Sequence, residues 1–296
     1  METTVPRLVV SSYKGKNGKT TATLALAYAL IKAGGFRVSL FKVGPDYIDP
    51  SYHSVIVNAP SRNLDYVLMG DKVVTRFYRY SLNSDIAIIE GVSGGLYDSV
   101  DGISEVGSTA QIAKLLRAPV VLVINGGERI NRTVRAIIRG GLRDFDREVK
   151  IVGAIVTNTT QRQVDKLRIA VESEGLEFLG YIPRSDGLED VMQYRHLGLI
   201  HAEEINKQRL INVFNEASSF IDVNKVIKVA KEYSEPLDVR DDVGPESFKV
   251  VSSELRVGIL GGRAFTFYYP ETIERIQSFT SNIKFIDQRL IRDLAI

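Results

Sequence analysis

A glycine-rich loop between an apolar run and a helical pattern is the feature that most constrains how this chain can fold. The loop reads YKGKNGKTT over residues 13–21, and the β-branched run Leu8–Val10 precedes it. Apolar residues at helical spacing follow the loop, and a glycine pair ends them: Leu24, Ala27, Tyr28 and Ile31, then Gly34 and Gly35. A strand, a glycine turn and a helix in this order are typical of a loop that binds nucleotide phosphates.

The loop departs from the standard P-loop pattern G-x-x-x-x-G-K-[ST], because Tyr13 stands where the first glycine is expected. What remains fits the deviant form K-G-x-x-G-K-T. In that form Gly15 and Gly18 let backbone N–H groups face phosphate oxygens. Lys19 then bridges the β- and γ-phosphates, and Thr20 offers its hydroxyl to Mg²⁺. The alternative is a glycine turn that does no more than cap a helix.

The predicted nucleotide-binding residues of the loop are Lys14, Gly15, Asn17, Gly18, Lys19, Thr20 and Thr21. Lys14 is open to two interpretations. It could reach a phosphate across a homodimer interface, or it could be a solvated loop lysine.

Short runs rich in β-branched residues recur along the chain and predict further strands: Val38–Val43, Ile86–Ile89, Val120–Ile124 and Ile151–Val156. Helix-like segments separate them. LEFLGYIPRSDG is interpreted as a last strand, and residues 201–233 as helical cover. The pattern predicts an α/β fold, with a mostly parallel, P-loop NTPase-like sheet covered by helices on both faces.

The composition changes after Tyr233, which predicts a domain boundary. Residues 1–233 form the predicted P-loop domain, and residues 234–254, acidic with two prolines, resemble a linker. Residues 255–296 begin a new strand at RVGILGG and continue into a predicted helix over Glu271–Ser278. Too few residues remain in this sequence to close a second domain.

Charge and residue counts exclude several classes of function. A formal net charge of +2 gives no field that would favour a nucleic acid. The longest apolar run, Ala118–Ile124, is too short to span a bilayer, so we expect a cytoplasmic protein. The absence of cysteine excludes disulfides, thiolate metal sites and a cysteine nucleophile.

The segment KVGPDYIDPSYH, Lys42 to His53, places a lysine and two acids about one βα unit downstream of the phosphate loop. This pairing indicates ATP chemistry on a second substrate. Asp46 and Asp49 stand where a metal or an acceptor has to be positioned.

A second acidic candidate follows the run DIAII, which carries Glu90 to the carboxyl edge of the sheet, where ligands of open α/β folds bind. Glu90 is therefore a candidate Mg²⁺ ligand, although it could also cap the turn that its neighbouring glycines make. Asp98 could serve the same ion or only its own turn.

The histidines and a row of arginines carry weaker signals. His53, His196 and His201 lack metal-binding spacing, so packing or surface roles are favoured over a zinc site. Four arginines at spacings of three and four are predicted to share one helix face: Arg132, Arg135, Arg139 and Arg143. That face is either a solvated surface or a guanidinium row for a polycarboxylate.

Several separate motifs together resemble the cobyrinic acid a,c-diamide synthase family over most of residues 7–270. They are the GKTT loop, KVGPDYIDPSYH with the following PSRNLD, IEGVSGGLYD, GSTAQIAKLL, APVVLVIN, and LGYIPR followed by RHLGL. The family has a P-loop amidoligase fold that is also similar to dethiobiotin synthetase.

The resemblance implies ATP- and Mg²⁺-dependent amidation of the a and c side-chain carboxylates of a tetrapyrrole, through an acyl phosphate that ammonia opens. By matching position it implies phosphate contacts for Lys19 and Lys42, and Mg²⁺ contacts for Thr20, Asp46 and Glu90. Asp49 is implied to orient the acceptor carboxylate, and Asn158 to read adenine. The implied catalytic residues are Lys19, Lys42, Asp46, Asp49 and Glu90.

The sequence also departs from the family pattern, at Tyr13, Lys16, Ser93 and Asn125. These departures could mark a member that acts on a different tetrapyrrole, such as nickel sirohydrochlorin. The final segment resembles the opening of the family's class I glutaminase domain. Without cysteine the chain cannot form a glutamyl thioester, so we expect free ammonia or a separate glutaminase chain to supply the nitrogen.

Two other interpretations stay open. A regulatory P-loop ATPase of the MinD or ParA type is suggested by Lys14, although such switches have an aspartate where Glu90 lies and no reason to keep KVGPDYIDP. An inactive remnant is the other alternative, suggested by the loop changes.

Overall fold

The structure is a computed structural model that describes residues 2–3, 5–128, 130–197, 206–239, 254–262, 265 and 267–287. The chain divides into two compact units, Met1–Val239 and Arg240–Ile296. The division falls inside the predicted linker, residues 234–254.

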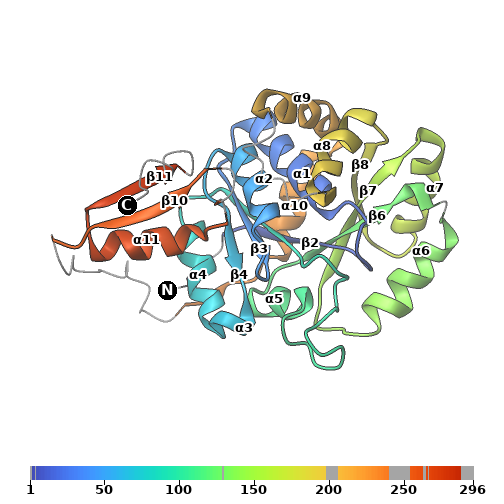
Figure 1. Ribbon diagram of the computed structural model, residues 1–296. Helices are drawn as coiled ribbons and strands as arrows, with labels where there is room; N and C mark the ends of the chain where they lie inside the picture. The colour runs from blue at the N-terminus through green and yellow to red at the C-terminus, as the bar shows by residue number, and fades with distance from the viewer. Residues whose placement is uncertain are drawn as a thin grey trace. The chain divides into compact units, whose positions relative to one another are not determined.

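The first unit is built on a seven-stranded sheet in the order β4-β3-β5-β2-β6-β7-β8 (Figure 1). All of its neighbouring strands are parallel. The strands are β2 (Arg7–Ser11), β3 (Val38–Val43), β4 (Arg62–Leu64), β5 (Ile86–Glu90), β6 (Val120–Asn125), β7 (Ile151–Thr159) and β8 (Glu177–Pro183). The parallel sheet confirms the predicted α/β fold class.

One face of the sheet is covered by α1 (Lys19–Gly34), α2 (Ile48–Val57), α8 (Asp186–Leu197), α9 (Lys207–Ala217) and α10 (Val223–Tyr233) (Figure 1). α1 lies at the centre of this layer and contacts α2, α9 and α10 as well as the sheet. Its Leu24 and Leu26 are fully buried. A helix enclosed on several sides is apolar around much of its circumference, and each fully buried leucine contributes about 1.5–3 kcal/mol to stability.

The other face is covered by α4 (Lys72–Ser81), α5 (Thr109–Leu115), α6 (Arg132–Ala136) with the π-helix Ile137–Arg143, and α7 (Gln161–Glu172). Strand residues alternate between the two layers. Leu40 of β3 belongs to the core under α1, whereas the ring of Phe41 lies 5.1 Å from that of Phe77 in α4.

Short elements complete the first unit: α3 (Tyr66–Met69), two 3-10 turns at Gly126–Glu128 and Ser218–Phe220, and the strand pair β1 (Glu2–Thr3) and β9 (Leu237–Asp238). Beside this pair, the buried guanidinium of Arg7 donates to the carbonyl oxygens of Leu116, at 2.6 Å, and Val5, at 3.0 Å. Burial, with a smaller effect of Arg117, lowers the pKa of Arg7 to about 10. Because β9 pairs with β1, residues 237–238 of the predicted linker form a strand of the first unit.

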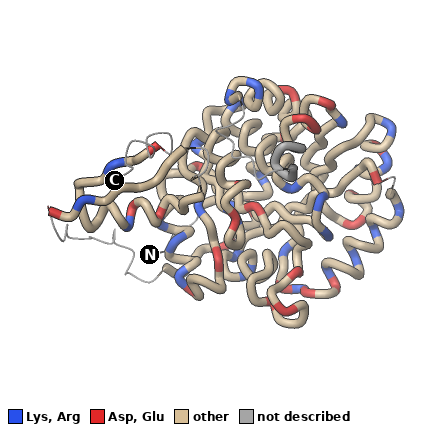
Figure 2. Tube along the Cα trace, viewed as in Figure 1, with Lys and Arg blue, Asp and Glu red and all other residues tan. Residues whose placement is uncertain are grey.

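The second unit contains β10 (Val257–Gly261), α11 (Pro270–Phe279) and β11 (Ile283–Asp287), with the two strands parallel. The strand and helix lie where the sequence predicts them. Acidic and basic positions are interspersed along the described chain (Figure 2). In the part of the chain that the structure describes, every helix is too short or too polar to cross a membrane.

Candidate functional site

The phosphate loop joins the end of β2 to the start of α1. Gly18 at the N-cap has φ 83°, a left-handed conformation that glycine adopts without strain. A Cβ at Gly18 would lie 3.0 Å from Thr157 Oγ1, closer than ordinary van der Waals contact, so the packing also favours glycine. Among the described residues no side chain caps α1, which leaves its first N–H groups to an anion. The loop therefore fits a nucleotide phosphate chain.

Lys19 links the phosphate loop to the segment that follows β5. Its Nζ donates to the carbonyl oxygens of Ser93, at 3.1 Å, and Gly94, at 2.6 Å. It also donates to Ser12 Oγ at 3.2 Å. Carbonyl and hydroxyl oxygens thus surround the ammonium group at the place where a phosphate oxygen is expected to approach it.

Lys14, another of the loop lysines, has a partner within its own chain. Its Nζ lies 2.8 Å from Glu128 Oε1, and the hydroxyl of Tyr13 donates to Glu128 Oε2 at 2.8 Å. Burial, together with the hydrogen bond to Glu128, raises the pKa of Tyr13 to about 12. The predicted phosphate contact of Lys14 stays a prediction.

A buried cluster of one lysine and two acids lies at the carboxyl ends of β3 and β5. Lys42 Nζ lies 2.7 Å from Asp49 Oδ2 and 3.1 Å from Glu90 Oε1. The hydroxyl of Thr20 donates to both acids, at 3.3 Å to Asp49 and at shorter range to Glu90. Burial lowers the pKa of Lys42, but the charges of Glu90, Asp49 and Asp46 outweigh burial and raise it above its ordinary value. Lys42 is therefore a fixed positive charge.

Asp46 lies beside this cluster and has a different contact. Its Oδ1 accepts hydrogen bonds from the backbone N–H groups of Ile48, at 2.8 Å, and Asp49, at 3.0 Å. Its Oδ2 is 3.8 Å from Lys42 Nζ. The structure thus places Asp49, and not Asp46, against Thr20, while Asp46 holds the start of α2.

His53 is a member of the site for which the sequence favoured only a packing or surface role. Its side chain is fully buried, and its Nε2 lies 2.7 Å from Glu90 Oε2. One signal could have found it: His53 follows Asp49 by four residues, so the two share one face of α2. The side chain of His196 and all of His201 lie outside the described residues.

The oxygen atoms of Thr20, Asp49 and Glu90 suit Mg²⁺, which prefers hard oxygen ligands. In the described ranges no group of three or more His, Cys, Asp or Glu side chains is arranged to hold a metal. Mg²⁺ in nucleotide sites is usually held by one or two carboxylates together with phosphate oxygens and water. The arrangement therefore fits a metal that arrives with a nucleotide.

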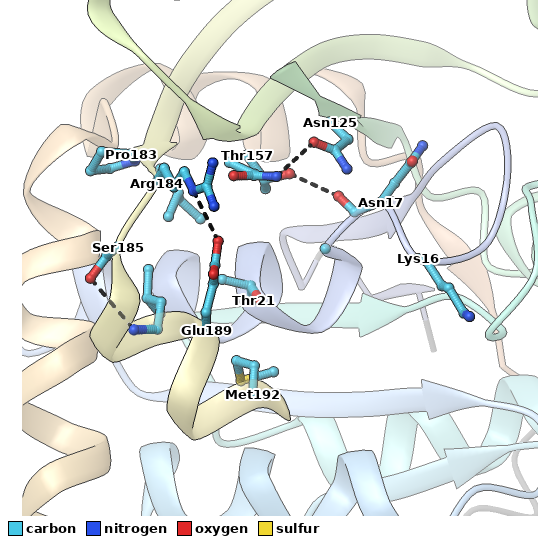
Figure 3. Close-up of a pocket in the computed structure, with 14 residues that line it drawn as sticks. Lys16, Asn17, Thr21, Asn125, Thr157, Pro183, Arg184, Ser185, Glu189 and Met192 are labelled. Carbon is cyan, nitrogen blue, oxygen red and sulfur yellow. Dashed lines mark hydrogen bonds and ion pairs between the residues drawn. The ribbon is translucent and has the colours of Figure 1, made fainter. Parts of the chain in front are cut away.

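A pocket of about 170 Å³ opens beside the phosphate loop, at the ends of β6, β7 and β8 (Figure 3). Asn17, Gly18 and Thr21 line it on the loop side. Asn158 also lines it, and its Nδ2 donates to Asn125 Oδ1 at 3.3 Å. The predicted contact of Asn158 with adenine stays a prediction.

The remaining candidates have structural contacts. Asp98 Oδ2 accepts from the backbone N–H of Gly95 at 2.6 Å, which is the turn role. Arg135 and Arg139 bind Glu174, at 2.7 and 2.9 Å, and Arg143 donates to the Glu174 carbonyl at 2.7 Å. Glu174 lies just before β8, at the opposite end of the strands from the phosphate loop. These contacts favour a structural role for the arginine row.

Comparison with known proteins gives a family match over most of the first unit. The model of the CobQ/CobB/MinD/ParA nucleotide binding domain matches residues 8–197. The MinD cell division protein of Aquifex aeolicus is a structural neighbour, with a TM-score of 0.44, 18% identity, and 79% of this chain and 99% of that chain covered.

Several curated relatives bear the name cobyrinate a,c-diamide synthase. The one from Archaeoglobus fulgidus is 38% identical over 93% of this chain and 59% of its own length. The one from Methanosarcina acetivorans is 36% identical over 92% of this chain and 56% of its own length. The one from Clostridium acetobutylicum is 36% identical over 90% of this chain and 59% of its own length. The chain thus spans less than two thirds of each of these relatives.

Proposed function

Because the chain belongs to the family of CobQ/CobB/MinD/ParA nucleotide binding domains, we propose that it is an ATP-dependent amidoligase. It converts the a and c side-chain carboxylates of a tetrapyrrole, cobyrinic acid, into amides through an acyl phosphate. One observation carries the proposal: the buried ion pair of Lys42 with Glu90 lies against Thr20, the residue that follows Lys19 in the phosphate loop. The names of the relatives supply the substrate class.

In the proposed reaction, a substrate carboxylate oxygen attacks the γ-phosphorus of ATP. The bond to the bridging oxygen breaks and ADP leaves with its electron pair. Ammonia then attacks the acyl carbon, and phosphate leaves as the amide forms. Lys19 and Lys42 hold positive charge near the transferring oxygens, where the carboxylate and the triphosphate repel each other.

Thr20 and Glu90 are the residues that would hold Mg²⁺, whose charge would offset the charge that develops on the phosphate oxygens. Asp46 is a third proposed ligand, from the resemblance. Asp49 is proposed to orient the acceptor carboxylate, and its contact with Lys42, at 2.7 Å, places it next to the cation that this carboxylate would approach.

The nitrogen is proposed to reach the site as ammonia from outside residues 1–296, either free or released by a glutaminase. The sequence has no cysteine. A glutaminase of class I needs a cysteine thiolate to release ammonia from glutamine. Purified protein of residues 1–296 that released ammonia from glutamine would contradict this part of the proposal.

The test is an amidation assay with ATP, Mg²⁺ and ammonia, on cobyrinic acid and on nickel sirohydrochlorin, with the products identified by mass spectrometry. Conversion of one or two carboxylates on cobyrinic acid supports the proposal. Conversion of nickel sirohydrochlorin alone would instead support a nickel-sirohydrochlorin a,c-diamide synthase. Conversion of neither substrate would contradict amidoligase activity on tetrapyrroles.

The second candidate is a regulatory ATPase of the MinD or ParA type, favoured by the lysine at position 14 of a deviant loop. In that case ATP turnover would need a stimulating partner and no carboxylate acceptor. The same assay separates the two candidates, because the amidoligase hydrolyses ATP in proportion to the amide formed.

A further inference from the structure

The two carboxylate oxygens of Glu90 face different surroundings. Oε1 accepts from Thr20 Oγ1 and from Lys42 Nζ, the latter at 3.1 Å, so it faces the phosphate loop. Oε2 lies 2.7 Å from Nε2 of His53, so it faces α2. The side chain is fully buried. Rotation of the carboxylate would break contacts on both sides.

The imidazole ring of His53 is itself held by other residues of the same chain. Nδ1 of His53 lies 3.0 Å from Ser61 Oγ, and that hydroxyl donates to the Leu40 carbonyl of β3 at 3.0 Å. The backbone N–H of Ser61 donates to Ser54 Oγ, also at 3.0 Å. His53 is fully buried and Ser61 is 1% exposed. A continuous, solvent-excluded chain of hydrogen bonds therefore runs from the sheet backbone to Glu90.

We propose that His53 is a positioning residue for the metal: held by Ser61, it fixes Glu90 so that Oε1 remains directed at Thr20 and at Mg²⁺ bound with ATP. The proposal rests on the proposed function, in which Glu90 holds that metal. Outer partners of this kind orient the ligands of metal sites, and their loss typically weakens metal binding 10–100-fold.

The position of His53 distinguishes this role from simple packing. An apolar ring of similar size would fill the same space but would remove the hydrogen bond between His53 and Oε2 of Glu90. Metal affinity should therefore follow the hydrogen bond to Glu90 and not the volume of the side chain. Two substitutions of His53 distinguish the contact of Nδ1 with Ser61 from the contact of Nε2 with Glu90.

In His53→Asn the side-chain amide stands near the position of Nδ1, so it can still bond Ser61 but no longer reaches Glu90. In His53→Gln the amide nitrogen stands near the position of Nε2, so it can still donate to Glu90. The two variants form a matched pair, because each removes the ring and each introduces an uncharged amide.

The measurement is Mn²⁺ binding, used in place of Mg²⁺ and followed by electron paramagnetic resonance of the free ion, in the presence of a non-hydrolysable ATP analogue. The full chain is used, and nucleotide affinity in chelator and thermal unfolding are recorded for each variant. His53→Asn should weaken Mn²⁺ binding about 10–100-fold. His53→Gln should bind Mn²⁺ more tightly than His53→Asn, with both variants keeping the metal-free nucleotide affinity.

Wild-type Mn²⁺ affinity in His53→Asn would overturn the inference, and so would equal losses in the two variants. If His53→Asn does not fold, Ser61→Ala carries the test, because it releases the ring and keeps the imidazole. Weaker Mn²⁺ binding then supports the inference, and unchanged binding overturns it. A wild-type protein that binds no Mn²⁺ with the nucleotide would contradict the proposed function itself, a result distinct from equal affinities.

Discussion

Replacement of Lys42 by methionine removes the ammonium group that Asp49 and Glu90 share. The side chain of Lys42 is 1% exposed, and those of the two acids are 6% and 1% exposed. Methionine keeps an unbranched side chain but leaves two buried carboxylates without their cation. Breaking a buried ion pair in this way costs about 3–5 kcal/mol. For a domain of this size, the loss corresponds to a melting temperature lower by about 6–20 °C.

The sign of the pH dependence follows from the two acids left behind. Two carboxylates that share a buried site cannot both ionise easily, so in the variant the pKa of one is raised above its unfolded value of about 4. A group with a raised folded pKa contributes stability below its unfolded value and loses it as the pH rises through the folded value. The stability deficit of Lys42→Met should therefore shrink as the pH falls from 7 toward about 4.

The assay is urea unfolding of the nucleotide-free protein, followed by circular dichroism at neutral and at mildly acidic pH. The double variant Lys42→Met with Glu90→Gln is the matched control, because it removes one of the two buried charges. It should recover part of the lost stability at neutral pH. A wild-type free energy of unfolding in Lys42→Met, or a further loss in the double variant at neutral pH, would refute the reasoning.

Four further predictions follow from the loop and from the arginine row. Lys19→Ala should weaken ATP binding at least about 10-fold in calorimetry, because a charge-assisted hydrogen bond contributes about 1.5–3 kcal/mol. The control Lys32→Ala, on the exposed end of the same helix, should keep the wild-type affinity. Equal affinities in the two variants would contradict the phosphate role of Lys19, and a wild type that never binds ATP would support an inactive remnant. Arg139→Ala should lower the melting temperature and leave the tetrapyrrole KM unchanged, and a raised KM would instead support the guanidinium row. Because hydrogen bonds from Arg139 and Arg135 lower the pKa of Glu174, the stabilising effect of this contact should be present at neutral pH and fade as the pH falls below about 4.5. Because the pKa of Tyr13 is raised to about 12, the contribution of Tyr13 to stability should be lost as the pH rises from about 10 to about 12. In pH-dependent unfolding, Tyr13→Phe should not show this loss. The same loss of stability in Tyr13→Phe would contradict the assignment to Tyr13.

The parts of the fold that the sequence predicts are those with strong local patterns. Buried parallel strands form continuous β-branched runs, so β3 is predicted at its observed bounds, Val38–Val43. The position of Glu90 at the carboxyl edge of the sheet is also predicted, because an acid directly after a buried apolar run lies where the strand ends. The phosphate loop is recognised because its glycines stand between a strand and a helix.

Other elements depend on partners that are distant in the sequence. β4 is a three-residue edge strand with two polar residues, and pairing with β3 is what makes it a strand. β9 lies in a segment whose composition indicates a linker, and it forms by pairing with β1. Local propensity carries little information about such pairings.

Within the site, the sequence could not separate the contacts of its two acids. Asp46 and Asp49 are equally acidic, but the carboxylate of Asp46 accepts two backbone N–H groups at the start of α2. Such local hydrogen bonds compete with longer-range ones, and only the fold shows that Asp49 is the acid that contacts Thr20. The contact of His53 with Glu90 joins residues 37 apart and is likewise set by the packing of α2 on the sheet.

The central claim is that a substrate carboxylate attacks the γ-phosphate, and isotope transfer tests it most directly. Cobyrinic acid labelled with oxygen-18 in its carboxylates is incubated with the protein, ATP, Mg²⁺ and ammonia, and the released phosphate is analysed by mass spectrometry. The proposed acyl phosphate predicts one labelled oxygen in the phosphate for each amide formed. Amide formation with unlabelled phosphate would contradict the claim, and so would phosphate release that does not depend on the carboxylate.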